Sequence, residues 1–340
     1  MKKLNTIKTI LSGLFIVTML VGCGQEASTS QPGAPTGSEA VEAEEAQAEV
    51  KEESVNETVE IENNDQLLVF TEPPQRAFTL NQHVTEVMLA LRLEEFMVGT
   101  AYLDDEVLPE FKDAYESIPV LSDRYPSQEV FLAEEPDFAY AGWASAFRED
   151  NIGTVEQLQE FGINAYLHES STIIGPTIED IYTDIRNISR IFHVEERGEE
   201  LIASMKEELE KIKNDIPEVT EKKRVFVFDS GDTAPFTVAQ NFLNSLITLA
   251  GAENIFSEIE KNWAEVSWEE VVDRDPEVII IVDYGETTVE EKKELLLRHP
   301  ALENVTAIEN ENFIVIPLSA AAEGVRAPYA LDILVNGLYK

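Results

Sequence analysis

Few residues of this 340-residue chain are of the types that catalyse reactions or bind metal ions. It has four histidines and one cysteine, and no two histidines have the spacing that would place both on one face of a helix as metal ligands. The Gly-rich Lys loop of nucleotide-binding proteins, the Gly-x-Ser-x-Gly turn, the Cys-x-x-Cys motif and the His-Glu-x-x-His motif are all missing from the sequence. The sequence gives no support for an enzyme, so binding is the chemistry to consider.

The single cysteine, Cys23, ends a leader with the layout of an export signal. The first eight residues include three lysines, and the apolar stretch at 10–21 is too short for a comfortable membrane span. The ending Leu20-Val21-Gly22-Cys23 resembles a bacterial lipobox, which implies cleavage before Cys23 and lipidation of that residue. A plain signal peptide with an incidental cysteine is the alternative. Lipidation would leave no thiol for a disulfide, a metal or a nucleophile.

Residues 24–65 have the composition of an acidic disordered tether. Their first part is rich in Ser, Pro and Gly, and residues 39–62 are dominated by Glu, Ala and Val without an aromatic residue. Such a segment buries too little apolar surface to offset chain entropy. The net charge of the whole chain is −41, and the acidic excess persists in residues 66–340. This charge excludes nucleic acids and anionic lipid surfaces as partners, whereas a cationic or neutral ligand and a basic docking partner are compatible with it.

Residues 194–216 predict one long helix around which the rest of the chain is arranged. They are rich in helix-forming residues and contain no proline. The apolar residues of this stretch fall at helical spacing, at Leu201, Ile202, Met205, Leu209 and Ile212. On either side, in residues 66–193 and 217–340, short apolar strands alternate with amphipathic helices, which predicts mostly parallel sheets. We therefore expect an α/β fold of two lobes joined by a single long helix; the alternative is one larger α/β domain with an ordinary surface helix.

Local signals place the elements within these two regions. Thr154 with Gln157, and Ser267 with Glu270, form capping boxes that predict helix starts. The continuous apolar run at 278–282 is typical of a strand buried on both faces. In parallel sheets, ligands collect at the carboxyl ends of the strands, so the residues that follow strands are the candidates for binding.

Four groups of short motifs occur in order along residues 66–340. They are Pro74-Gln75-Arg76 with Thr85-Glu86-Val87 and Val98-Gly99; Ser127-Gln128-Glu129-Val130 with Glu135-Pro136-Asp137-Phe138; Arg224-Val225-Phe226 with the stretches 234–237 and 251–256; and the stretch 263–269 with 275–279. Each group alone is weakly specific. The ordered set resembles the extracytoplasmic solute-binding proteins of ABC importers, in the group for ferric siderophores, haem and vitamin B12. The resemblance spans almost all of residues 66–340 and does not identify the ligand.

The resemblance implies a fold of two α/β lobes joined by one long helix, in agreement with the helix expected at 194–216. It implies a stiff connection with modest closure on ligand binding, no enzymatic activity and no resident cofactor. It also implies that the permease docks on one glutamate from each lobe, and by motif these are Glu129 and Glu269. Both also stand in the first turn of a predicted helix, where the helix dipole favours a carboxylate with or without docking.

The same resemblance implies a ligand cleft lined by the loops that follow the strands. Tyr102, Phe236, Trp263 and Arg326 stand where relatives contact their ligands. The full set expected at or beside the cleft is Asn81, Gln82, His83, Tyr102, Arg124, Tyr125, Tyr140, Trp143, Phe236, Trp263, Tyr284 and Arg326. Aromatic rings suit flat or greasy chelates, and arginine suits carboxylate or catecholate oxygens. For each aromatic residue the alternative is core packing, and Trp268 is expected in the core.

We therefore expect a lipid-anchored, monomeric protein on the extracytoplasmic face of the cell membrane. It would capture an iron chelate, with a ferric siderophore ahead of haem or cobalamin, and deliver it to an ABC permease and its ATPase subunit. A bare zinc or manganese binder is one alternative, using His83, His168 and an acid such as Asp283. A third histidine for it is hard to find, because His193 and His299 lie in or beside predicted helices. The other alternative is a chelatase-like enzyme, which would need an ionisable pair with shifted pKa values in the cleft.

Overall fold

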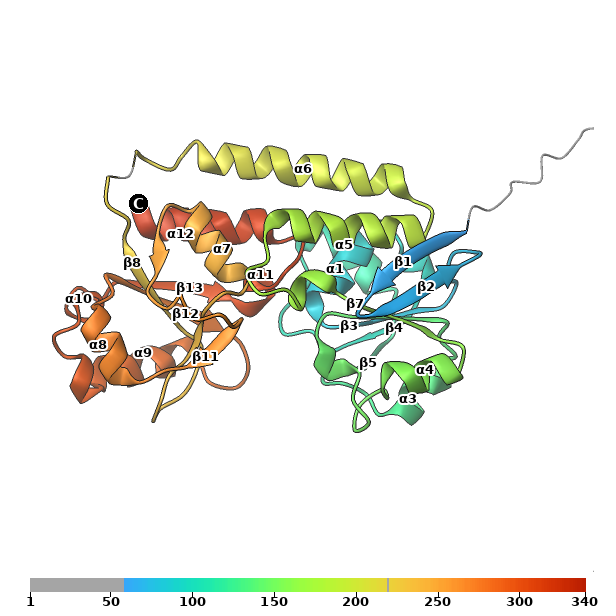
Figure 1. The fold of residues 1–340 in the computed structure, drawn as a ribbon, viewed down its shortest axis with the longest axis horizontal. Coiled ribbons are helices and arrows are strands. Elements are labelled where there is room, and N and C mark those ends of the chain that lie inside the picture. Colours follow the sequence, from blue (N-terminus) through green and yellow to red (C-terminus); the bar gives the residue numbers. More distant parts are fainter. Residues whose placement is uncertain (1–57, 219) are drawn as a thin grey trace, which may run out of the picture. The chain divides into compact units, whose positions relative to one another are not determined.

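The computed structural model describes residues 58–218 and 220–340. The leader with Cys23 and the tether as far as residue 57 lie outside the described residues. In the described part of the chain, no helix combines the length and the apolar character needed to cross a membrane. Two parallel sheets, one from each half of this part, are linked by the long helix α6 (Figure 1).

The first lobe is built on a five-stranded parallel sheet with the strand order β5-β4-β3-β6-β7. The chain starts at the central strand β3, moves to one side of it, and then returns to the other side. Such a reversal opens a crevice at the carboxyl ends of the strands. The elements of this lobe are β1 Val59–Asn63, β2 Gln66–Phe70, β3 Ala77–Leu80, α1 Gln82–Ala90, β4 Met97–Ala101, α2 Lys112–Tyr115, β5 Val120–Ser122, α3 Gln128–Ala133, β6 Phe138–Ala141, α4 Val155–Glu160, β7 Asn164–Leu167 and α5 Ile178–Ile191.

The fold begins earlier in the chain than the composition indicates. β1 pairs antiparallel with β2, and its side chains Val59 and Ile61 are buried in the core. Asn63 fastens this hairpin to the end of β7, because its side-chain amide donates to the carbonyl of Leu167 (2.8 Å) and accepts from the amide of the same residue (2.9 Å). The predicted disordered tether is therefore wrong from residue 59 to residue 65. Alternate apolar residues in an acidic stretch are enough to give a strand one buried face.

The second lobe has a four-stranded parallel sheet with the strand order β10-β8-β12-β13, and a separate antiparallel pair, β9 with β11. Strand β12 is buried along its apolar residues, as its composition predicts. The elements are β8 Arg224–Phe228, β9 Phe236–Val238, α7 Phe242–Leu249, β10 Glu253–Asn254, β11 Trp263–Glu265, α8 Trp268–Arg274, β12 Val278–Asp283, α9 Val289–Arg298, α10 Thr306–Glu309, β13 Phe313–Pro317, α11 Leu318–Ala321 and α12 Ala327–Tyr339.

The connecting helix α6, Glu195–Lys213, packs against α5 of the first lobe and α12 of the second. Three residues of the predicted apolar stripe, Ile202, Met205 and Leu209, are buried in the core. Gly198 lets α6 approach α5 closely, because a Cβ atom at this position would lie 2.5 Å from the hydroxyl of Ser189. Both lobes therefore pack against α6.

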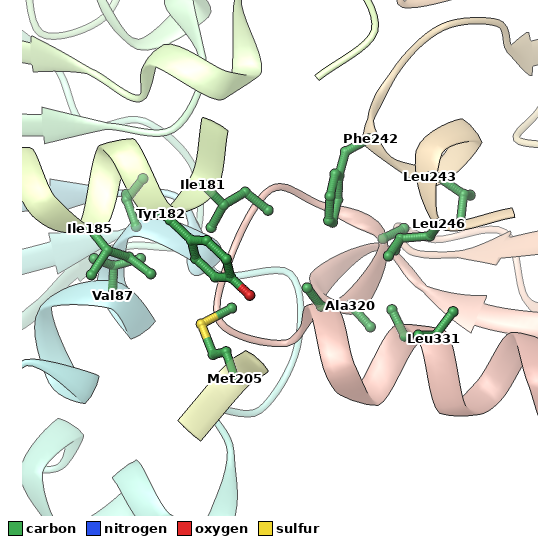
Figure 2. Close-up of a cluster of buried hydrophobic side chains, with 14 of the residues drawn as sticks. Val87, Ile181, Tyr182, Ile185, Met205, Phe242, Leu243, Leu246, Ala320 and Leu331 are labelled. Carbon is green, nitrogen blue, oxygen red and sulfur yellow. The ribbon is translucent and has the colours of Figure 1, made fainter. Parts of the chain in front are cut away.

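One hydrophobic cluster runs through both lobes and α6. Figure 2 shows Val87 and Ile185 of the first lobe, Met205 of α6, and Phe242 and Leu331 of the second lobe in this cluster. Close-packed side chains of this kind resist separation, because opening the contact exposes apolar surface from both sides. The predicted α/β fold, with two lobes of mostly parallel strands joined by a long helix, is confirmed.

Candidate ligand-binding site

Residues that follow strands in both sheets line one cavity of about 430 Å³. This volume is typical of small-ligand sites. Six of the side chains expected at the cleft line it: Tyr102, Arg124, Trp143, Phe236, Trp263 and Tyr284. The cavity is therefore formed by both lobes, at the ends of the strands where the topology predicts a ligand.

The wall from the first lobe is built around Tyr102, the residue after β4. Arg124 donates to the hydroxyl of Tyr102 (2.7 Å), and its guanidinium lies 5.0 Å from the centre of that ring. Tyr125 does not line the cavity; its ring packs edge-on against Tyr102, and its hydroxyl donates to Oδ1 of Asn81 (3.0 Å). The φ angles of Tyr102 and Asn81 are +60° and +90°, which L side chains rarely adopt. Backbone strain of this kind persists only where neighbouring contacts hold it.

The wall from the second lobe is an aromatic stack on the antiparallel pair β9 and β11. Phe236 and Trp263 project from the same face of this ribbon, with ring centroids 5.6 Å apart and an interplanar angle of 6°. Phe236 is 38 % exposed, which leaves its ring available to a ligand. Below the stack, the hydroxyl of Tyr284 donates to Asp229 (2.7 Å). This wall presents flat apolar surface with one polar pair beside it.

Carboxyl groups are the dominant charged groups of the cavity. Asp104, Asp229 and Glu323 line it, and Arg124 is the one cation among the described lining residues. Burial raises the pKa of all three carboxyls, and that of Glu323 rises to about 7. Near neutral pH the carboxyl of Glu323 therefore exists partly as a neutral carboxylic acid, which both donates and accepts hydrogen bonds.

Amide and hydroxyl groups complete the polar lining. Asn241, Asn262 and Ser171 contribute side chains to the cavity. Oδ1 of Asn262 is buried without a hydrogen-bond partner in the described structure. Ser171, from the first lobe, donates to Glu323 of the second (3.3 Å). The lining can thus meet amide, hydroxyl or carbonyl groups of a ligand.

Two histidines lie behind Trp143 and do not line the cavity. The ring of His83 lies 5.0 Å from that of Trp143 and 5.3 Å from that of His168, and both histidines are buried. Gly142 makes room for His83, because a Cβ atom there would lie 2.3 Å from the ring. His83, expected at the cleft, therefore does not line this cavity, because its imidazole is covered by Trp143; its contact with the ligand stays a prediction.

His168 belongs to a buried hydrogen-bond network around Asp184. Burial lowers the pKa of His168 to about 3, so the imidazole is neutral. The hydroxyl of Tyr140, whose pKa burial raises, is hydrogen-bonded to Nδ1 of His168 (2.7 Å). Asp184 accepts from the hydroxyl of Tyr166 (2.8 Å) and from the amides of residues 169 and 170. Because His168 is neutral, its 3.5 Å approach to Asp184 is a dipolar contact and not an ion pair.

Arg326 does not face the cavity. It is 5 % exposed, and its guanidinium donates to both carboxylate oxygens of Glu86 (2.7 and 2.6 Å). Arg326, expected to contact the ligand, instead forms a buried ion pair between the lobes and does not line this cavity; its contact with the ligand stays a prediction. Gln82, expected beside the cleft, is likewise buried in the neighbouring loop contacts.

The geometry does not assemble the bare-metal site considered as an alternative. Among the described residues there is no group of three or more His, Cys, Asp or Glu side chains that could hold a metal ion. His83 and His168 do lie together, but Asp283 is an exposed residue at the end of β12. A histidine pair with one engaged ring nitrogen is a weak basis for a zinc or manganese site.

Glu129 and Glu269 are both exposed, in the first turns of α3 and α8. Each helix begins with a serine N-cap, Ser127 and Ser267, whose side chain accepts a backbone amide. Figure 1 shows α3 and α8 on the side of the lobes away from α6. The positions suit a contact with a partner, and docking on them remains a prediction.

A larger hollow of about 690 Å³ lies between α5, α6 and α7. Its lining includes Tyr182, Lys206 and Leu209, and none of the residues that follow strands at the cleft. We assign the ligand to the smaller cavity because that cavity combines aromatic surface, polar groups with raised pKa values and strand-end position.

Six polar lining residues were missed from the sequence: Asp104, Ser171, Asp229, Asn241, Asn262 and Glu323. Asp229 directly follows β8 and Asp104 lies near the end of β4, so the strand-end rule applied to polar residues would have found both. Glu323 follows a run of alanines after α11, and no local signal marks it.

Residues 78–320 match the family described as periplasmic binding protein. A vitamin B12-binding protein of Vibrio parahaemolyticus is 27% identical over 214 residues, which is 63% of this chain and 72% of that protein. The uncharacterised ABC transporter substrate-binding lipoprotein YvrC of Bacillus subtilis is 22% identical over 284 residues, covering 83% of this chain and 82% of that one. The crystal structure of a periplasmic binding protein from Veillonella parvula superposes with a TM-score of 0.76 and 32% identity, over 83% of this chain and 97% of that one.

Proposed function

The chain belongs to the periplasmic binding protein family, and from this premise we propose that its ligand is a bulky, flat metal chelate of the corrinoid class. It is a substrate-binding protein of an ABC importer and not an enzyme. The observation that carries the ligand proposal is a cavity with aromatic walls from both lobes and a lining of carboxyl and amide groups. Relatives that bear the name vitamin B12-binding protein support the same choice.

The aromatic walls favour a flat ligand. The parallel rings of Phe236 and Trp263 offer one broad surface, and Tyr102 with Trp143 offers another from the first lobe. An extended ring system buries more apolar area between such walls than a compact ligand does, at roughly 25 cal/mol per Å². Aromatic walls of this kind therefore suit a macrocyclic chelate better than a bare ion.

The charges favour a neutral or cationic ligand. Catecholates and the propionates of haem are anionic, and among the described lining residues Arg124 is the one cation that could meet them, since Arg326 is bound to Glu86. The carboxyls of Asp104, Asp229 and Glu323 would oppose such a ligand when ionised. A corrinoid has a cationic metal centre and carboxamide side chains, which carboxyl and asparagine groups can meet. The site thus shifts the preference from a ferric siderophore with anionic oxygens to a corrinoid.

The joint between the lobes supports modest closure around the ligand. The shared cluster shown in Figure 2 and the packing of α6 on both lobes restrain large rotations. A cavity that is largely formed before the ligand arrives loses little binding free energy to ordering. This is suited to capture of a dilute solute.

The delivery step uses the two exposed glutamates. Glu129 and Glu269 would each meet a basic group on the permease, one from each lobe, and so set the register of docking. Cys23 would carry the lipid anchor that keeps the protein at the extracytoplasmic face of the membrane, as the lipobox resemblance implies. The similarity to a protein named as a lipoprotein supports this part of the proposal.

Isothermal titration of the purified protein tests the ligand proposal. Cyanocobalamin is expected to bind, whereas a ferric catecholate, haem and free zinc ions are expected to bind more weakly or not at all. A ferric hydroxamate, which is neutral, is the closest competitor and belongs in the same panel. Tight binding of haem or of zinc alone, without binding of cyanocobalamin, would overturn the corrinoid assignment.

A further inference from the structure

The loop at residues 102–108 carries Tyr102 and Asp104 into the ligand cavity. It has neither helix nor strand structure, so its shape is set by side-chain contacts. Side-chain oxygens of Gln82 and Glu86 on α1 accept hydrogen bonds from the backbone of the loop. Oε1 of Gln82 accepts the amides of Asp104 (3.1 Å) and Asp105 (2.9 Å), and Oε1 of Glu86 accepts the amide of Leu108 (3.1 Å).

The second lobe holds the same loop through Arg326. Its Nη2 donates to Oε1 of Glu86 (2.6 Å) and to the carbonyl of Glu106 (2.6 Å). Its Nη1 donates to the hydroxyl of Ser319 (3.0 Å), which in turn donates to Oδ2 of Asp105 (3.0 Å). One guanidinium from the second lobe is therefore bonded to α1, to the loop backbone and, through a serine, to a loop side chain.

We infer that Arg326, paired with Glu86, is a positioning residue that fixes the loop 102–108 from the opposite lobe and thereby sets the affinity of the cavity. Neither Arg326 nor Glu86 lines the cavity. The inference rests on the proposed assignment of the ligand to that cavity. It gives Arg326 a role in binding that needs no contact with the ligand.

The burial of the pair explains why the loop depends on it. The side chains of Glu86 and Arg326 are 0% and 5% exposed, so each charge relies on the other and on its hydrogen bonds. Removing one partner leaves the other as an uncompensated buried charge, which draws water or moves its neighbours. The nearest movable backbone is the loop that carries Tyr102 and Asp104. Replacing both partners with apolar residues of similar length leaves no unpaired buried charge. It still removes the hydrogen bonds that hold the loop.

The test compares a double variant with a matched control. Glu86→Met with Arg326→Met removes the pair between the lobes; Arg186→Met with Glu199→Met removes an ion pair between α5 and α6 that does not touch the loop. Amide hydrogen exchange in the full chain should speed up at Leu108 and its loop neighbours by about tenfold or more in the first variant and not in the control. Exchange in strand β12 should be unchanged in both.

Affinity for cyanocobalamin supplies the second readout. In the first variant it should fall by about 3- to 30-fold, the range of coupling through residues that do not touch a ligand. Arg326→Lys should lie between wild type and the double variant, because one ammonium cannot reach Glu86, the carbonyl of Glu106 and Ser319 together.

Three results distinguish a failure of the positioning role from a failure of the proposed ligand class. Unchanged exchange and unchanged affinity in a folded double variant would overturn the inference. Exchange that accelerates equally in β12 would also overturn it, because the pair would then only stabilise the fold. Faster exchange confined to the loop, in a protein that does not bind cyanocobalamin even as wild type, would support the positioning role and overturn the proposed ligand class.

Discussion

The two walls of the cavity are held in place by different forces. The wall from the first lobe is held by hydrogen bonds, from Arg124 to Tyr102 and from Tyr125 to Asn81. Tyr102 and Asn81 also have strained backbone conformations. The wall from the second lobe is the stacked pair Phe236 and Trp263 on a two-stranded ribbon. Hydrogen bonds fix direction as well as distance, whereas ring stacking fixes a surface and tolerates sliding.

This difference indicates that the two lobes contribute different properties to one binding site. The first lobe presents groups in fixed directions, so changes there should disturb the fold as well as the ligand. The second lobe presents apolar area, so changes there should lower affinity and leave the fold almost intact. The following predictions test that contrast, beginning with the largest expected effect.

Trp263→Ala should weaken binding of cyanocobalamin by roughly 2–3 kcal/mol, because it removes half of the aromatic stack from the cavity. Thermal unfolding should change little, since Trp263 is only partly buried. Titration calorimetry and a melting curve measure the two effects. Phe161→Ala, at an exposed aromatic residue outside the cavity, is the control and should bind normally. A large loss of stability without loss of affinity would contradict the contrast.

Glu323 lies where the two walls of the cavity meet. Its replacement by glutamine, Glu323→Gln, should stabilise the fold at high pH. Burial raises the pKa of Glu323 from 4.5 to about 7, so the folded protein takes up a proton more readily than the unfolded chain. Ionisation therefore opposes folding progressively between pH 4.5 and 7, and fully above pH 7. Glutamine has no such penalty, and the variant should gain about 3 kcal/mol at pH 8 relative to wild type.

The same variant should show almost no gain at pH 4.5, where Glu323 is protonated in the folded protein. Urea denaturation at pH 4.5, 6 and 8 measures the free energy of unfolding in each case. An equal gain at all three pH values would show that the effect comes from packing and not from ionisation.

Tyr125→Phe should destabilise the fold by about 1–2 kcal/mol, because it leaves Oδ1 of Asn81 without its hydroxyl donor in a buried site. Its hydroxyl also lies 3.0 Å from that of Ser145. Tyr329→Phe, at an exposed tyrosine, is a matched control and should be neutral. Chemical denaturation distinguishes the two. A neutral Tyr125→Phe would mean that the strained wall of the first lobe is held by its backbone alone.

Glu129→Ala with Glu269→Ala should have the smallest effect on the isolated protein. Each glutamate contributes about 0.3–1 kcal/mol at most to the start of its own helix, and both are far from the cavity lining. The double variant should therefore fold and bind ligand normally but fail to support uptake in cells, since docking would lose one contact from each lobe. Uptake that survives in a stable double variant would leave these residues with a structural role only.

The local pattern of the sequence predicts most of the fold. The apolar run at 278–282 forms the buried strand β12, and both predicted capping boxes are present at α4 and α8. The strands β9, β10 and β11 have only two or three residues each, too few to show a period in the sequence. The tether boundary was missed because a charged stretch can still pair along one apolar face.

The site was harder to predict than the fold, for a physical reason. Aromatic residues after strands were found because strand ends converge in a parallel sheet. Whether a charged residue faces a ligand or a partner depends on contacts that are remote in sequence. Arg326 binds Glu86, 240 residues away, and the pocket position of Glu323 depends on a contact with Ser171. Neither partner leaves a local signal.

The shared hydrophobic cluster also determines when the chain can fold. Val87 and Ile185 belong to the same cluster as Leu331 and Leu334, which lie on the last helix of the chain. A chain that is being synthesised therefore lacks part of its core until its final residues have emerged. A segment that ends before that helix leaves part of this apolar cluster uncovered. For a chain with the proposed export leader, this delay would keep the polypeptide unfolded, and so able to pass through a translocation channel, during its synthesis.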